Sequence, residues 1–246
     1  MSKIIKIALI LIGSGILLCI LAAVLTHGDW TRFNSKGNDL VSKSYESGTD
    51  ISELVLEENA QSVIVKVADT DTISIEYFDD PTTPMYEITE QNGKLAFRHV
   101  GNGPFKLVNI DFTDRTSVIT IPRDYAGKLE VGISAGSLEA DDITVSELQV
   151  GTSAGSIELR NVTCTGNVDI GNTSGSVEFL NLEAGGDIDI ANTTGSIEGS
   201  IVGSKDDYSI SSETTAGSCN LENSTGGKHK LTAATTAGSI DITFTK

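Results

Sequence analysis

The chain has 246 residues and a formal net charge of −17 at pH 7, from 34 acidic and 17 basic side chains. Nucleic-acid-binding proteins need basic faces, so this charge excludes a nucleic-acid partner. Aromatic residues make up only 5% of the chain, which argues against a globular core built on large rings.

The first predicted element is an apolar segment near the N-terminus. An uncharged run from Ile7 to Leu25 would measure about 28 Å as an α-helix, close to the ~30 Å hydrocarbon core of a bilayer. Secretory signal peptides have shorter apolar cores, of about 7–15 residues. Leu18 precedes Cys19, where a lipoprotein signal would have a small residue. We therefore expect an uncleaved transmembrane anchor over residues 7–26, with a cleaved signal peptide as the alternative.

The charges around this segment predict its orientation. Lys3 and Lys6 precede it, whereas the residues that follow carry mixed charge. By the positive-inside rule, residues 1–6 form a cytoplasmic tail and the rest of the chain lies outside the cell. The composition of residues 27–50, with Gly, Ser, Asn and mixed charge, is typical of a polar linker.

Alternating apolar and polar residues predict β-strands throughout residues 51–125. Asn92 and Gly93 stand between two alternating runs, which is a strong signal of a two-residue hairpin. Residues 107–112 and 117–122 form another expected strand pair. We interpret residues 51–125 as irregular first rungs of the structure that follows, or as a small β cap that shields its end.

The remaining residues, 126–246, contain six copies of a glycine–serine turn, of which TSAGSIE at 152–158 is one. A repeat near 20 residues is typical of a solenoid. Glycine permits positive φ or a close backbone approach, so each glycine is expected to turn the chain at the same corner of every rung. The six turn glycines are Gly136, Gly155, Gly175, Gly195, Gly217 and Gly238.

Apolar residues recur at fixed offsets from these glycines and alternate with polar ones, which is the period of a strand. Seven positions before the glycine stand Leu129, Leu148, Val168, Ile188, Ile210 and Leu231. Five before it stand Val131, Val150, Ile170, Ile190, Ser212 and Ala233. Two after it stand Leu138, Ile157, Val177, Ile197, Cys219 and Ile240, and seven after it Ile143, Val162, Leu182, Val202 and Ser224.

A unit of such short strands cannot bury its apolar face alone, so successive units are expected to stack in parallel about 4.8 Å apart. The predicted fold is therefore all-β: a parallel β-solenoid of about six rungs, continuous with the N-terminal β region and preceded by one transmembrane helix. No separate C-terminal cap is predicted. Cys219 fits an apolar column, and Cys164 lies at a different offset, so we predict no disulfide between them. Polar side chains three positions before the glycine predict an internal ladder: Asn172, Asn192, Thr214 and Thr235.

Outward-facing carboxylates form the one candidate site. Three positions after the glycines stand Glu139, Glu158, Glu178 and Glu198, which would stack about 4.8 Å apart in register. One hypothesis is that this strip binds a divalent cation such as Ca²⁺, or a cationic surface partner. The alternative is a solvated face whose charges are screened by salt. A second, partial acidic column comprises Glu130, Asp169 and Asp189.

No Ser/His/Asp or Cys/His arrangement and no phosphate-binding loop is present in the sequence, so we predict no catalytic residue, no cofactor other than that Ca²⁺ and no enzymatic activity. Parallel β-helices do include polysaccharide-active enzymes that use paired acids. A polysaccharide-active enzyme therefore remains an alternative, together with a passive surface scaffold.

Three features together resemble a known family: an N-terminal membrane segment, a β region ending in a strand and Ile-Pro, and repeated x-G-S-[IVL]-[ED] turns after strands of the type L-x-V. The chain is similar, over about residues 50–246, to the bacterial putative-adhesin domain family of unknown function, and it resembles LiaG-type cell-envelope proteins of Gram-positive bacteria. Members commonly carry G-S-G-D at the turn, whereas this chain has A-G-S or T-G-S. The resemblance implies a β-solenoid at the cell surface and no catalytic residues.

From these patterns we expect a single-pass membrane protein with its C-terminal domain outside the cell. It would bind cell-wall polymer or an envelope protein, or act as an accessory in envelope-stress signalling. Given the bacterial resemblance, the N-x-S/T sequons are ascribed to turn chemistry rather than to glycan attachment. They begin at Asn161, Asn172, Asn192 and Asn223.

Overall fold

The computed structural model describes residues 40–48, 50–100 and 115–245. Within these ranges no helix combines the length and the apolar character that crossing a bilayer requires. Several expectations lie outside the described residues: the cytoplasmic tail at 1–6, the anchor at 7–26 and the strand at 107–112.

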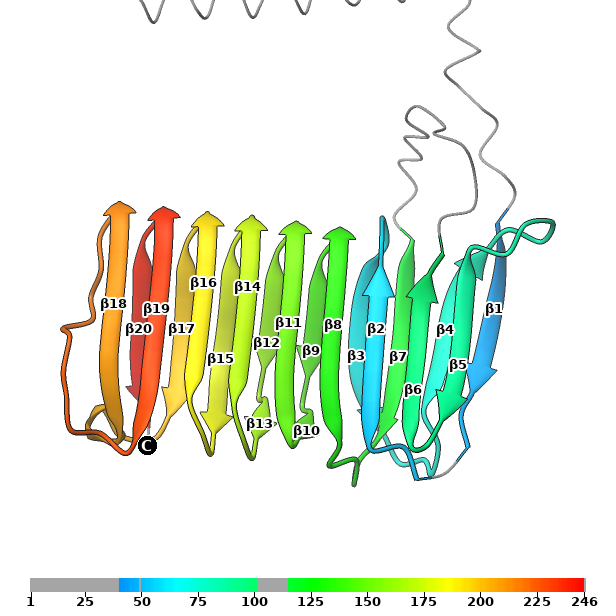
Figure 1. The fold of residues 1–246 in the computed structure, drawn as a ribbon, viewed down its shortest axis with the longest axis horizontal. Coiled ribbons are helices and arrows are strands. Elements are labelled where there is room, and N and C mark those ends of the chain that lie inside the picture. Colours follow the sequence, from blue (N-terminus) through cyan, green and yellow to red (C-terminus); the bar gives the residue numbers. More distant parts are fainter. Residues whose placement is uncertain (1–39, 49, 101–114, 246) are drawn as a thin grey trace, which may run out of the picture. The chain divides into compact units, whose positions relative to one another are not determined.

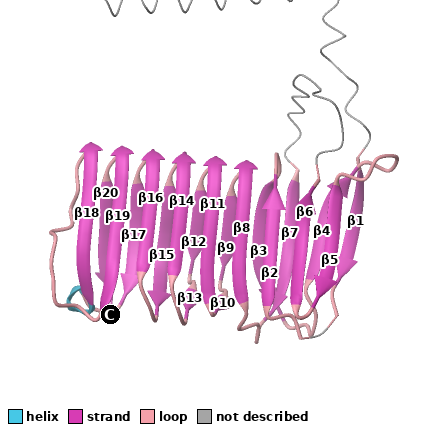
Figure 2. Cartoon of the chain, in the orientation of Figure 1, coloured by secondary structure: helices cyan, strands magenta, loops and turns pink. Residues whose placement is uncertain are grey.

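The described residues from Val41 onward belong to one compact unit. The regular secondary structure of this unit is almost entirely β-strand, with short loops and turns between the strands, as Figure 2 shows. The described part contains one short 3₁₀ helix, η2 (Lys205–Asp207). The strands form two sheets with a continuous hydrophobic core between them.

The nine-stranded sheet is called sheet B here, and its strands lie in the order β18 (Tyr208–Ala216), β19 (His229–Ala237), β16 (Ile188–Thr194), β14 (Val168–Ser174), β11 (Glu147–Ala154), β8 (Lys128–Ala135), β2 (Glu53–Glu58), β6 (Lys94–His99) and β5 (Tyr86–Gln91). The eleven-stranded sheet is sheet A, with β1 (Val41–Glu46), β4 (Ser74–Asp79), β7 (Thr116–Pro122), β3 (Ser62–Ala68), β9 (Leu138–Asp141), β12 (Ile157–Arg160), β15 (Val177–Ala184), β17 (Ile197–Val202) and β20 (Ile240–Thr245) in order. Two short strands, β10 (Thr144–Val145) and β13 (Thr163–Cys164), continue from the end of β15.

The predicted all-β fold with parallel strands is confirmed. Equivalent residues of neighbouring repeats lie opposite one another, so each apolar column forms one continuous line of the core. The register runs Leu129–Leu148–Val168–Ile188 in sheet B and Leu138–Ile157–Val177–Ile197 in sheet A. All eight side chains are at most 1% exposed, so the repeat period alone located the core.

One column shifts by a residue. Ile201, not Val202, lies opposite Leu182, because the register between β15 and β17 changes between Phe179 and Leu182. Ile201 is fully buried and Val202 is half-buried. A bulge of this kind moves the alternation by one position, and the regular spacing of the sequence does not reveal it.

The glycine turns form a backbone ladder. Each of the six glycines has a φ between 127° and 158°, a region that residues with a side chain rarely adopt. A Cβ on Gly155 would overlap the carbonyl oxygen of Gly136 in the neighbouring rung, and a Cβ on Gly175 would overlap that of Gly155. The glycines therefore permit both the turn and the close approach of successive rungs.

The last two repeats do not stack in chain order, which corrects the expectation of sequential rungs. Strand β16 pairs with β19, and β19 then pairs with β18, so the sixth repeat lies between the fourth and the fifth. Figure 1 shows β18 as the outermost strand, beyond β19. On the other sheet, β17 pairs with β20, and Ile240 forms a bridge to Cys219.

The inner side chains of the two repeats explain this order. The fifth repeat places Ser212 and Cys219, both half-buried, in columns where the sixth places the buried Ala233 and Ile240. The Ser212 hydroxyl donates to the carbonyl of Leu221, at 3.3 Å, within its own repeat. Interior burial without such a partner would be costly for this hydroxyl. The polar-cored repeat therefore lies at the end.

The fifth repeat is also the C-terminal cap that the sequence analysis did not predict. Its return segment lies along the outer edge of β18, where Ile210 and Ser224 exchange backbone hydrogen bonds of 3.0 Å in both directions. The side chain of Asn223 accepts from the amide of Ser212 at 2.7 Å. These contacts satisfy edge groups that would otherwise invite pairing with another chain.

The N-terminal end folds back in the same way. Strands β2 and β3 stack directly on β8 and β9, and β6 and β7 stack outside β2 and β3. Antiparallel strands β5, β4 and β1 complete this end. The predicted hairpin at Asn92-Gly93 is confirmed, with φ of 54° and 75°. Strand β1 lies within residues 27–50, which the composition had indicated as a linker, and it pairs with β4.

Candidate functional site

The structure brings the four predicted glutamates into one column on the outer face of sheet A. Glu139 lies opposite Glu158, Glu158 opposite Glu178, and Glu178 opposite Glu198. Asp241 continues the column from β20, so five carboxylates follow one another on adjacent strands. At the end of the column the Asn220 amide donates to Asp241 at 2.6 Å. We call these five carboxylates the acidic column.

A single arginine neutralises one part of the acidic column. The Arg160 guanidinium donates to the carboxylate of Glu139 at 2.9 Å and to that of Glu158, and lies 4.0 Å from Asp141. The hydrogen bond with Glu139 raises the pKa of Arg160 above its ordinary value. Sequence reasoning missed this arginine because it stands two positions after Glu158, outside the glutamate column, and the equivalent position of the other repeats holds no arginine. In the described ranges, no basic side chain forms an ion pair with Glu178, Glu198 or Asp241.

A shallow groove lies beside the unpaired glutamates. It measures about 240 Å³, and Leu180 on its border is 53% exposed, whereas the other leucines of the described ranges are buried or half-buried. The Phe179 ring packs where Gly199 lacks a side chain, since a Cβ on Gly199 would overlap that ring. The groove is lined by Glu158, Leu159, Arg160, Glu178, Phe179, Leu180, Glu198 and Gly199.

The metal hypothesis for the acidic column finds no support in the geometry. Nowhere in residues 40–48, 50–100 and 115–245 do three His, Cys, Asp or Glu side chains gather as metal ligands. Ca²⁺ takes 6–8 oxygens at about 2.3–2.6 Å, whereas two neighbouring carboxylates of the column supply at most four. The arrangement instead presents a line of separate negative charges, which fits a partner with several positive groups.

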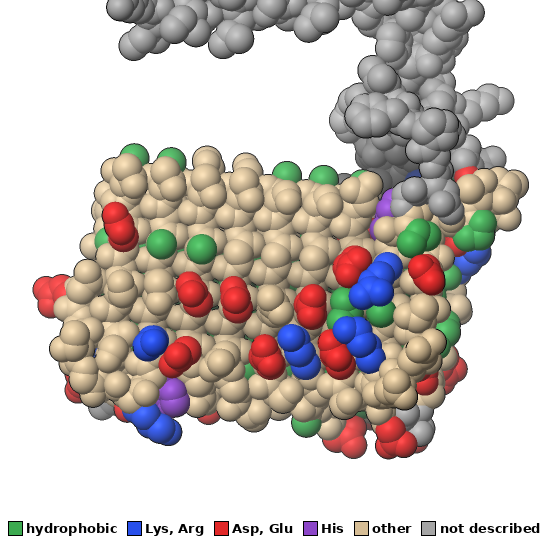
Figure 3. Space-filling view, viewed as in Figure 1, with side chains coloured by type: hydrophobic (Ala, Val, Ile, Leu, Met, Phe, Trp, Pro, Cys, Tyr) green, Lys and Arg blue, Asp and Glu red, His purple; other side chains and the backbone are tan. Residues whose placement is uncertain are grey.

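The second acidic column lies on the outer face of sheet B and is interrupted. Gln149 separates Glu130 from Asp169, and only Asp169 and Asp189 lie directly opposite one another. Lys128 is 3.8 Å from Glu130. Figure 3 shows acidic and basic side chains intermixed on this face. Charge on sheet B is therefore mixed, in contrast to the acidic column.

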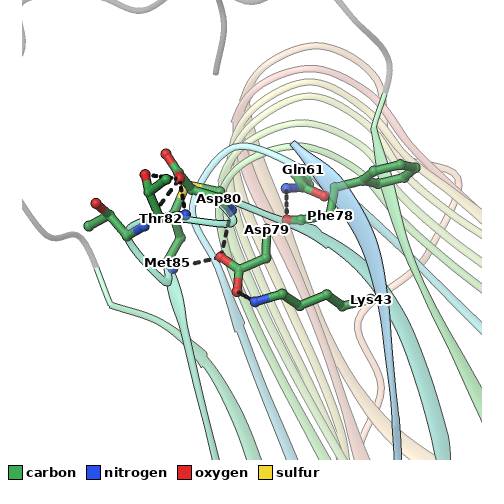
Figure 4. Close-up of polar contacts among 8 residues, drawn as sticks. Lys43, Gln61, Phe78, Asp79, Asp80, Thr82 and Met85 are labelled. Atoms are coloured by element: carbon green, nitrogen blue, oxygen red, sulfur yellow. Dashed lines mark hydrogen bonds and ion pairs between the residues drawn. The ribbon is translucent and has the colours of Figure 1, made fainter. Parts of the chain in front are cut away.

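A buried polar centre holds the N-terminal cap together (Figure 4). The Asp79 carboxylate accepts from the Lys43 ammonium at 2.7 Å and from the backbone amides of Asp80 and Met85 at 2.9 and 2.7 Å. The Asp80 side chain in turn accepts from the amide and hydroxyl of Thr82, both at 2.7 Å. These bonds tie β1, β4 and the loop before β5 to one another, which is a structural role.

Glu58 is a second buried acid of the cap, and it lies between a pocket and the core. Its carboxylate accepts from the Ser117 hydroxyl at 2.6 Å, from the Tyr86 hydroxyl at 3.0 Å and from the Asn59 amide at 3.2 Å. Burial raises the pKa of Glu58. Because both oxygens already accept hydrogen bonds from the protein, the carboxyl is held as part of the fold rather than presented to a substrate.

The pocket beside Glu58 is open and measures about 580 Å³. His99 lies on its wall, and burial lowers the pKa of this imidazole. Besides these two residues it is lined by Glu57, Asn59, Gly132, Ile133, Ser134, Gly151 and Ser153. Its polar groups are two carboxyls, an amide, an imidazole and two serine hydroxyls, and of these the Glu58 carboxyl is already engaged by hydrogen bonds within the protein.

The cysteines and the internal ladder lie where the sequence indicated. Cys164 and Cys219 are both free thiols. Asn172 and Asn192 are only 5% exposed, and their amides donate to the carbonyls of Gly155 and Gly175. The side chains at these two sequons therefore serve the turns.

The architecture defines the class of protein: stacked parallel rungs with a glycine ladder and folded-back ends. The sequence matches the family model described as Toastrack DUF4097 over residues 51–246, and the chain belongs to this family. This confirms the resemblance to an adhesin-like domain family of unknown function. No protein of curated function matches the chain significantly.

Two solved structures are similar to this chain to different degrees. One is described as a "putative cell adhesion protein" from Clostridium sporogenes; it is 14% identical, with 84% of this chain and 100% of that chain covered and a TM-score of 0.56. A "putative adhesin" from Bacteroides fragilis is 14% identical, covers 84% of this chain and 98% of its own, and has a TM-score of 0.33. At these identities the first match shows the fold alone, and the TM-score of the second is too low for an argument.

Proposed function

We propose that this chain is a non-catalytic, membrane-anchored module outside the cell that binds a partner through the outer face of sheet A. The family and the fold support an adhesin-like module, as does the description of the Clostridium structure. The apolar run at residues 7–26 supports the anchor. The saturated hydrogen bonds of Glu58 support a role without catalysis.

The acidic column carries the proposal. Like charges directly opposite one another on neighbouring strands destabilise a sheet. The chain nevertheless places five carboxylates in succession and supplies one arginine, at Arg160. A cost of this kind is expected where a partner provides the missing positive charges on binding.

The groove beside Glu178 and Glu198 indicates what the partner presents. An exposed leucine next to unpaired carboxylates fits an envelope protein whose lysine or arginine side chains flank an apolar residue. The apolar contact would contribute affinity, and the charges would set orientation and association rate. Leu180 is the apolar anchor in this arrangement.

The test is retention of envelope components by the full-length chain in mild detergent. We expect Glu178→Gln with Glu198→Gln to lose most of the retained partner, and Leu180→Ser to weaken retention. The matched control is Asp169→Asn with Asp189→Asn, which removes two charges from the outer face of sheet B. Equal loss of retention in both double variants would show that net charge, and not the acidic column, is responsible for retention. Retention of a wall polymer alone, unaffected by either variant, would contradict the proposed partner.

The location has a separate test. We expect the chain to fractionate with membranes and to be cleaved when protease is added to intact cells. A chain that resists external protease until the membrane is opened would contradict the proposed orientation. A chain at the surface that retains nothing would instead be a passive scaffold.

A further inference from the structure

The C-terminal end of sheet B carries a cavity that the proposed function does not use. Its walls come from β18, from β19 and from the return segment that joins them, residues 217–228, which Figure 1 shows beyond β18. The cavity measures about 500 Å³, whereas small-molecule sites in proteins span roughly 300–1,000 Å³. Its size therefore suits a ligand of a few functional groups.

The polar groups that line this cavity include hydrogen-bond donors that the protein leaves free. Within the described ranges, the hydroxyls of Ser211, Thr225 and Thr232 form no hydrogen bond with the chain. The side-chain oxygen of Asn223 accepts from the amide and the hydroxyl of Ser212, which leaves the Asn223 NH₂ group without a partner there. Three hydroxyls and one amide thus line one cavity, which suits a ligand rich in acceptors.

Lys230 adds a positive charge to the same cavity. Across the described part of the chain, its ammonium forms no ion pair, in contrast to Arg160 in the groove of sheet A. Asp187 accepts from the backbone amide of Lys230 at 2.8 Å, and Asp189 lies opposite Thr232 on β16, but neither acid lines the cavity. Acids farther away are screened over about 8 Å at physiological salt. The local charge therefore favours an anion.

Both walls of the cavity are held in place before a ligand arrives. Ser211 and Thr232 lie directly opposite one another on paired strands. The return segment is fixed to β18 by the two backbone hydrogen bonds between Ile210 and Ser224, and the Ser224 hydroxyl also donates to the carbonyl of Tyr208 at 3.3 Å. A site whose groups are already ordered loses less conformational entropy on binding.

We propose that this cavity binds a phosphorylated sugar, with the phosphate at Lys230 and the sugar hydroxyls at Ser211, Thr225 and Thr232. An ammonium offers three donors to a phosphate, and such charge-assisted hydrogen bonds are roughly twice as strong as neutral ones. Phosphate alone would leave most of the cavity empty, whereas a sugar ring would occupy the space beside the hydroxyls. The inference does not depend on the proposed function, because it concerns another face and a ligand of opposite charge.

Equilibrium dialysis of the full-length chain in mild detergent against glucose 6-phosphate tests this proposal. We expect saturable binding. Lys230→Gln should weaken the affinity at least about tenfold, because it removes the charge from the phosphate contact, and Ser211→Ala with Thr232→Val should weaken it several-fold. The matched control is Lys228→Gln, which removes an exposed lysine outside the cavity and should leave the affinity unchanged.

Glucose and inorganic phosphate, used as separate probes, distinguish the two halves of the ligand, and each should bind more weakly than glucose 6-phosphate. Glucose bound equally well would contradict the role of Lys230, and phosphate bound equally well would contradict the sugar contacts. The absence of saturable binding, or equal loss in Lys230→Gln and Lys228→Gln, would overturn the proposal. An unchanged melting temperature of Lys230→Gln shows that its lost affinity is not lost folding.

Discussion

The hydroxyl of Tyr86 donates to the carboxylate of Glu58 within the hydrophobic core of the cap, 3.0 and 3.1 Å from its two oxygens. The carboxylate has no basic partner among the described side chains, and burial raises its pKa. The folded state therefore binds this proton more tightly than the unfolded chain does. As pH rises from the unfolded pKa through the folded pKa, the free energy of unfolding falls, and the loss persists at higher pH.

We accordingly expect Glu58→Gln to flatten the dependence of stability on pH. The amide keeps an acceptor for Ser117 and carries no charge to bury. Denaturant unfolding at pH 5 and pH 8 should show a smaller loss of stability with rising pH in this variant than in the parent chain. Glu57→Gln, on the neighbouring exposed residue, is the control. Identical pH profiles for Glu58→Gln and the parent would show that Glu58 ionises without penalty.

Gly175, in the turn after β14, and Gly171, within β14, are expected to differ in how well they tolerate a side chain. Gly175 has a φ of 127°, and a Cβ there would overlap the carbonyl of Gly155. We expect Gly175→Ala to destabilise by roughly 2–4 kcal/mol, since backbone strain and overpacking each cost about 1–3 kcal/mol. Gly171 has nothing within 4 Å of the same position, so Gly171→Ala should change stability by less than about 1 kcal/mol. Denaturant midpoints compare the two, and equal losses would exclude the turn ladder as the cause.

The ion pair of Lys43 and Asp79 should be more important than surface pairs. Asp79→Ala leaves the amides of Asp80 and Met85 without their acceptor in a buried setting. We expect a loss of about 3 kcal/mol in unfolding free energy. The control is Asp69→Ala, which breaks an exposed pair with Arg123 and should have little effect. Thermal unfolding measures both, and a small effect of Asp79→Ala would mean that water replaces the carboxylate.

The inverted order of the last repeats predicts an inverted pattern of amide protection. Strand β19 is paired on both edges, whereas β18 is at the end of sheet B. Hydrogen exchange should therefore be slower over residues 229–237 than over residues 208–216, because end strands open at lower free energy. Faster exchange in β19 than in β18 would indicate that the repeats stack in chain order.

The repeats, their inward columns and the turn glycines were all visible in the sequence. Leu129, Leu148 and Val168 are buried because the alternation of apolar and polar residues places each of these columns on the inner face of its strands. The hairpin at Asn92-Gly93 was equally local, since two residues with positive φ specify it. The candidate glutamates followed from the same columns, because residues at equal offsets lie on the same face.

The tertiary structure alone decided which rung lies beside which. Every repeat offers the same pattern of strands, so several stacking orders satisfy the columns equally well. The choice depends on summed differences between cores, such as Ser212 against Ala233, that no single repeat reveals. The same holds for Glu58 and Ser117, or Lys43 and Asp79, whose contacts join distant segments that are not equivalent. Local periodicity thus determined the rung, and contacts between non-equivalent residues determined the order of the rungs and the two ends.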